Sequence, residues 1–63
     1  MLAVLETTKG LYTVNLTKIL FFYSIKSGAY TRLEMEDGTL IDVFMSYDEV
    51  NKKLKEAGLV LPQ

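Results

Sequence analysis

Hydrophobic and polar positions divide the chain into short segments of strand length. Turn signals separate them at Lys9-Gly10, Lys26-Ser27-Gly28 and Glu36-Asp37-Gly38. The segments between the turns are rich in β-branched and aromatic residues, which favours strands. The predicted strands span residues 2–7, 11–14, 19–25, 30–35 and 39–45. Because the connections are short, we expect neighbouring strands to be antiparallel.

Two kinds of connection are predicted between these strands. Asp37-Gly38 favours a two-residue hairpin turn, since both positions tolerate a positive φ. Ser27-Gly28 is expected to turn the chain in the preceding loop in a similar way. Residues 15–18 form a polar corner that should redirect the chain between the second and third strands.

The start of a helix is the sharpest local signal in the sequence. Ser46 and Glu49 fit the S-x-x-E capping box, in which each side chain accepts a hydrogen bond from the other residue's backbone amide. Gly58 is expected to end the helix as a left-handed cap. The predicted helix spans residues 47–57, and its apolar stripe consists of Val50, Leu54 and Ala57.

These elements predict one α+β domain over residues 1–63, a small antiparallel sheet or partial barrel of about five strands followed by one C-terminal helix. The third and fifth strands are apolar on both faces. In the third, alternation predicts one face with Ile19, Phe21, Tyr23 and Ile25, and the opposite face with Leu20 and Phe22. One helix covers only one face, so the other needs sheet curvature or a partner.

Composition favours a partner. A chain of 63 residues buries only about 60% of the surface that its unfolded form exposes. Its hydrophobic content is nevertheless 49%, so some apolar side chains must lie outside the core and mark an interface. The sequence contains neither cysteine for disulfides nor histidine for an ordinary zinc site. Self-association is the stabilising device that remains, and we expect a homo-oligomer.

The available chemistry argues against an enzyme. Without histidine or cysteine, Ser-His-Asp and Cys-His catalytic systems are excluded. Glu34, Glu36 and Asp37 cluster around a hairpin, and we interpret them as a solvated acidic turn. No catalytic residue, cofactor site or metal site is predicted. The net charge of −1 comes from scattered charges, which does not favour a nucleic-acid-binding stripe.

The candidate interaction surface consists of Phe22, Tyr23, Tyr30, Arg32, Phe44, Leu59 and Leu61. Tyrosine and arginine are typical of interface hot spots, and they could also stack on a nucleobase. In the alternative interpretation, Arg32 pairs with Glu34 or with a cross-strand acid, and the tyrosines cover sheet edges. Lys52, Lys53 and Lys55 could form a weak nucleic-acid surface or an ordinary exposed helix face.

Nearly the whole chain resembles the small flagellar and swarming proteins of the FlbD/SwrD family. The matching positions are Lys9-Gly10, Val14-Asn15, Ile19, Leu33, Glu36-Asp37-Gly38, Val43, Ser46 and Glu49-Val50. Residues 19–46 are also similar to the first half of a LytTR-type DNA-binding domain. That similarity rests on Ile19–Tyr23, Gly28–Leu33, Asp37-Gly38 and Ser46. Both resemblances imply a small accessory protein of a bacterium or a phage.

From these patterns we expect a non-catalytic, homo-oligomeric module for protein interaction or regulation. The alternative is a nucleic-acid- or nucleotide-binding regulator related to half a LytTR-type domain. The apolar runs Leu2–Leu5 and Ile19–Tyr23 are too short for a secretory signal or a membrane span. A cytoplasmic protein that binds itself and a further protein, without membrane insertion, is therefore expected.

Overall fold

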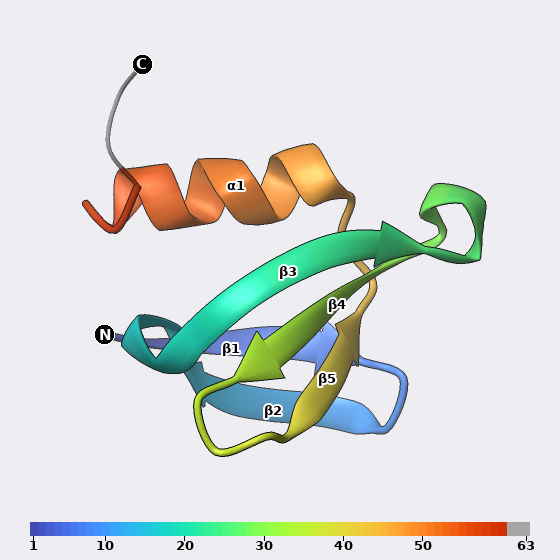
Figure 1. Cartoon of the computed structure of the whole chain (residues 1–63), viewed down its shortest axis with the longest axis horizontal. Coiled ribbons are helices and arrows are strands. Elements are labelled where there is room, and N and C mark those ends of the chain that lie inside the picture. The colour runs from blue at the N-terminus through green and yellow to red at the C-terminus, as the bar shows by residue number, and fades with distance from the viewer. Residues whose placement is uncertain (61–63) are drawn as a thin grey trace.

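A computed structural model describes residues 1–60 and contains a five-stranded antiparallel sheet followed by one C-terminal helix (Figure 1). The elements are β1 (Leu2–Thr7), β2 (Gly10–Asn15), η1 (Leu16–Lys18), β3 (Ile19–Ile25), η2 (Lys26–Gly28), β4 (Tyr30–Met35), β5 (Leu40–Val43) and α1 (Tyr47–Glu56). The predicted α+β class is confirmed. Of the two predicted forms, the open sheet is present, because β2 and β3 remain as separate edges.

The strand boundaries agree closely with the predicted ones. β1, β3 and β4 have the predicted bounds, whereas β2 is one residue longer at each end. β5 is shorter than predicted and stops at Val43, since Met45 lies next to the helix cap. The helix ends at Glu56 and Ala57 is its C-cap residue.

The sheet consists of a hairpin and a meander joined along a short seam. Its strand order is β2-β1-β5-β4-β3. β1 and β5 share only the register pair Thr7–Val43, and hydrogen bonds from Thr8 N to Asp42 O and from Phe44 N to Glu6 O extend the seam. In Figure 1 α1 lies above β3, and β4 and β5 cross the β1–β2 hairpin, with the β4–β5 turn reaching below β2. The sheet therefore curls, and its concave side receives the helix.

The core lies between the sheet and α1. Its buried apolar members are Leu5, Val14, Leu16, Leu33, Ile41, Val43, Val50 and Leu54. The helix contributes Val50 and Leu54, and Ala57 packs against them, which confirms the predicted stripe. Leu33 and Val43 are fully buried, at 0% exposure each. We call this side of the sheet the core face and the opposite side the outer face.

The predicted assignment of side chains to the two faces of the third strand is wrong at the start of that strand. The pairing register of β3 shifts between Ile19 and Phe21, which marks a β-bulge or similar irregularity. An extra residue in a strand reverses the alternation of side chains on either side of it. Ile19 consequently packs against the core together with Phe22, while Phe21 joins Tyr23 on the outer face.

The turn between β4 and β5 also differs from the predicted two-residue turn. Met35 N donates to Thr39 O and Gly38 N donates to Met35 O, both at 2.9 Å, so the loop comprises residues 36–38. Gly38 has a φ of 90° and ends this loop in the manner of a bulged type I turn. The Asp37 carboxylate accepts from Thr39 N at 2.9 Å, which lowers the pKa of Asp37. This acceptor bond stabilises the longer loop.

The two remaining connections contain short 3₁₀ turns. The predicted polar corner is η1, where the Asn15 side chain accepts from Thr17 N at 3.2 Å and Leu16 is buried in the core. In η2, Lys26 and Ser27 both adopt left-handed backbone conformations, with φ of 52° and 55°. The turn predicted at Ser27-Gly28 is present, with Gly28 at a φ of 91°, whereas the sequence does not indicate the positive φ of Lys26.

The predicted helix cap is confirmed. Glu49 N donates to Ser46 Oγ at 3.1 Å, and Ser46 N donates to Glu49 Oε1 at 3.0 Å. This bond lowers the pKa of Glu49. At the other end, Gly58 N donates to Lys55 O and Leu59 N donates to Leu54 O, which is a Schellman motif with Gly58 at φ 74°.

We expect Ser46→Ala to lower the free energy of unfolding by about 1 kcal/mol, because it leaves the Glu49 amide without its acceptor. Urea denaturation followed by circular dichroism would measure the loss. Lys52→Ala, a change to an exposed residue of the same helix, is the matched control and should have little effect. Equal midpoints for the two variants would contradict the cap's role.

Candidate interaction surface

Three rows of side chains cross the outer face of the β3–β5 meander. The middle row follows the register Tyr23–Arg32–Asp42. The first row contains Phe21, Glu34 and Leu40, and the third contains Ile25, Tyr30 and Phe44. The outer face therefore alternates between polar and apolar groups, with the polar ones near its centre.

Arg32 and Asp42 form a two-point ion pair in the middle row. Arg32 Nε donates to Asp42 Oδ1 at 2.8 Å, and Arg32 Nη2 donates to Asp42 Oδ2 at 3.1 Å. The guanidinium holds the pKa of Asp42 below its ordinary value, and the carboxylate raises the pKa of Arg32. The predicted pairing of Arg32 with a cross-strand acid is confirmed, and Asp42 is that acid.

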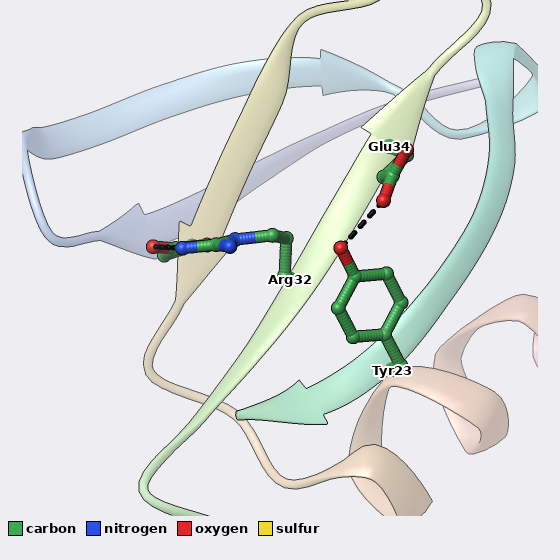
Figure 2. A network of polar contacts seen from close by, with 4 residues as sticks. Tyr23, Arg32 and Glu34 are labelled. Atoms are coloured by element: carbon green, nitrogen blue, oxygen red, sulfur yellow. Dashed lines mark hydrogen bonds and ion pairs between the residues drawn. The ribbon is translucent and has the colours of Figure 1, made fainter. Parts of the chain in front are cut away.

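Tyr23 is tied to Glu34 next to this pair. The Tyr23 hydroxyl donates to Glu34 Oε2 at 2.5 Å, and this bond raises the pKa of the phenol. Figure 2 shows the Tyr23 ring pointing from β3 toward Glu34, while Arg32 extends from β4 in the other direction. The polar groups of the outer face thus satisfy one another within the chain.

Exposed apolar side chains flank the polar row on both sides. Leu40 is 53% exposed, and Phe21 and Phe44 are each 49% exposed. The Phe44 ring lies edge-on to Tyr30, with 5.1 Å between ring centroids, and the Phe21 ring stacks on Tyr23 at 6.0 Å. The pairs Phe21–Tyr23 and Phe44–Tyr30 thus form two apolar ridges whose rings already contact each other within the chain. Aromatic groups of this kind are typical of protein-contacting surfaces.

The β1–β2 hairpin continues the apolar character of the outer face. Leu2, Val4 and Leu11 are more than half exposed, and Leu11 is the most exposed of them at 72%. The seam bond from Phe44 N to Glu6 O connects this hairpin to the meander. Apolar side chains therefore occur on the outer face of β1 to β5, interrupted by Glu6 and the polar row.

The structure brings four of the seven predicted surface residues together: Tyr23, Tyr30, Arg32 and Phe44. Phe22 lies on the core face instead, where its ring centroid is 5.0 Å from that of Tyr47. Leu59 is exposed beyond the helix, and Val60 beside it packs against the core. Leu61 lies outside the described residues.

Sequence reasoning missed several members of this surface: Val4, Leu11, Phe21, Leu40 and Asp42. Alternation in the fifth strand correctly separates Leu40 from the buried Ile41, so Leu40 could have been included. Alternation in the third strand likewise places Phe21 on the same face as Tyr23, so Phe21 could also have been predicted. Asp42 becomes recognisable only when the β4–β5 register is known.

A cavity of about 570 Å³ opens beside β2. Tyr12 and Val14 of β2 line it opposite Ile41, and Lys18, Glu36 and Asp37 contribute charges. Within residues 1–60 no group of three or more acidic residues is placed to hold a metal ion. In the same range no helix has the length and apolar character needed to cross a membrane.

Acidification should weaken the fold partly through Asp42. Its pKa in the folded chain lies below the ordinary value of 3.8, so the folded chain binds this proton less readily than the unfolded chain. The stabilisation is complete well above pH 3.8 and is lost as the pH falls through the folded-state pKa. The urea midpoint should therefore decrease more between neutral and acidic pH in the wild type than in Asp42→Asn. An equal fall in both would contradict this role.

Comparisons of the chain with protein-family models, curated proteins and solved structures find no match. The resemblances to FlbD/SwrD proteins and to half a LytTR-type domain therefore stay predictions.

Proposed function

We propose that this chain is a non-catalytic module that associates with itself and binds another protein. The observation that carries the proposal is the outer face, opposite α1, where β1, β2, β3 and β5 each expose large apolar side chains. Single exposed apolar residues are ordinary, but a group of them on one face marks an interaction site. A chain of 63 residues has little other surface on which to place one.

The helix cannot cover this face. α1 buries Val50 and Leu54 against the core face, and its fixed cap at Ser46 directs it across β3 and β4. The short seam between β1 and β5 also leaves the sheet open. Within residues 1–60 no element covers the outer face, which supports a second chain as its cover.

Charge supports a protein partner over a nucleic acid. The Arg32 guanidinium is engaged by Asp42, and Glu34 lies on the same face, so a phosphate would meet carboxylates there. The exposed Lys52 and Lys55 belong to α1, which packs on the opposite side of the sheet. The tyrosine–arginine group and the helix lysines thus do not form one surface. A role as a bacterial or phage accessory protein in the cytoplasm is part of the proposal and rests on the sequence alone.

Thermal unfolding at different protein concentrations tests the proposal. Self-association stabilises the folded chain by mass action, so the melting temperature should rise with concentration. A monomer would melt at the same temperature throughout a hundredfold range of concentration, and that result would contradict the proposal. A titration with duplex and single-stranded DNA at low salt is the complementary test, because tight binding there would favour the alternative function.

A further inference from the structure

β2 forms a free edge of the sheet. Within the described residues 1–60 it pairs only with β1, in an unbroken register from Leu2–Asn15 to Thr7–Gly10. Leu16 N donates to Met1 O at 2.8 Å, so the backbone groups of even-numbered residues in β2 point toward β1. By alternation, the N–H and C=O groups of Leu11, Thr13 and Asn15 point away from the sheet.

This edge lacks the features that protect edge strands from pairing. The segment Gly10–Asn15 contains neither a charged residue nor a proline, and its register has no shift. β3, at the other edge, has a register shift and contacts α1. The contrast indicates that β2 is the edge available for a further strand.

We propose that β2 pairs antiparallel with β2 of a second copy of this chain, with the two Thr13 residues opposite each other. This inference rests on the self-association proposed above and names the element that carries it. Centring the pair on Thr13 places Leu11 opposite Asn15 of the second copy. All outward-pointing backbone groups of the segment are then paired, and a continuous sheet spans both copies.

Side chains on both faces gain contacts from this arrangement. On the outer face, the exposed Leu11 of one copy lies opposite Asn15 of the other and diagonally next to its Thr13, within reach of both side chains. On the core face, Tyr12 of the second copy comes to lie opposite Val14, at the wall of the 570 Å³ cavity. Tyr12 is 39% exposed in the single chain, and the cavity offers its ring a site of suitable size.

Charge favours the antiparallel direction. It brings the Lys9 end of one β2 strand to the Asn15 end of the other. Glu36 and Asp37 outnumber Lys18 at the Asn15 end, so Lys9 meets a net negative charge. A parallel arrangement would place Lys9 beside Lys9 of the other copy, which is unfavourable.

Charge substitutions at Thr13 test the pairing. Thr13→Lys and Thr13→Glu each place like charges opposite each other, so each variant alone should dimerise at least about tenfold more weakly than the wild type. An equimolar mixture of the two should recover the dimer, because opposite charges then face each other. Thr13→Val keeps the backbone N–H and the branched shape, and it should dimerise like the wild type. Light scattering coupled to size-exclusion chromatography gives the masses.

Hydrogen exchange of the wild type provides a readout that does not depend on a variant's folding. The Leu11, Thr13 and Asn15 amides should become more protected as protein concentration rises. If Thr13→Lys and Thr13→Glu each still dimerised, and if the protection of these amides did not change with concentration, the β2 pairing would be wrong. Self-association itself would still stand. A wild-type chain that stays monomeric would instead remove both this inference and the function on which it rests.

Discussion

Replacing Leu33 by alanine is expected to lower the free energy of unfolding by about 2–5 kcal/mol. Leu33 is fully buried in β4, between Phe22 of β3 and Ile41 of β5 in the register. Truncation leaves a cavity that this tightly connected centre of the meander cannot fill. Since a core in so small a chain seldom supplies more than about 3–5 kcal/mol, much of the population should unfold at room temperature.

Urea denaturation followed by circular dichroism measures this effect, with Leu20→Ala as the matched control. Leu20 lies in the same meander but is 64% exposed, so its truncation should cost far less. If the two variants unfolded at the same denaturant concentration, Leu33 would not be at the centre of the core.

Thr31→Val should be the next most damaging change, at about 1–3 kcal/mol. Thr31 is fully buried, and its hydroxyl donates to the Met45 carbonyl at 2.7 Å, immediately before the helix cap. Valine has nearly the same shape but no donor, so the carbonyl loses its partner. The effect should appear in thermal and urea unfolding, and it should loosen the connection between β5 and α1.

Thr13→Val is the control for this substitution, since it makes the same chemical change at an exposed position of β2. Its effect on stability should be within about 0.5 kcal/mol. A stable Thr31→Val variant would mean that the hydroxyl bond to Met45 contributes nothing to holding the helix entrance.

Features encoded by adjacent residues could be predicted from the sequence. The capping box at Ser46 and Glu49 and the glycine cap at Gly58 depend only on their own neighbourhood, and both are present as predicted. The helix stripe followed from the same local spacing. Strand positions were also accurate, because turn residues mark their ends.

Features that depend on distant pairing could not be predicted. The β1–β5 seam joins the chain's first strand to its fifth, and no local pattern specifies such a contact. The register shift near Ile19 puts Ile19 on the core face with Phe22, although strict alternation placed Ile19 with Phe21. Arg32 forms its ion pair with Asp42 and not with Glu34, which is nearer in the sequence. Asp42 is the register partner of Arg32 on the neighbouring strand, and the sequence alone does not give that register.

In the proposed function, the core face of the sheet stabilises the fold and the outer face binds other chains. The polar groups of the outer face pair internally through Arg32–Asp42 and Tyr23–Glu34, so removing water from them costs less than it would for unpaired charges. The apolar ridges beside them supply the gain on burial. If β2 carries self-pairing, the β3–β5 ridges stay available for a different protein.

Sedimentation equilibrium over a wide range of concentrations tests the central claim most directly, because it reports the mass of the native chain without any substitution. One chain has a mass of 7.2 kDa, and the account predicts a weight-average mass that rises toward at least twice this value. A mass that stays at 7.2 kDa up to high concentration would show that the exposed apolar face tolerates water. That result would contradict self-association.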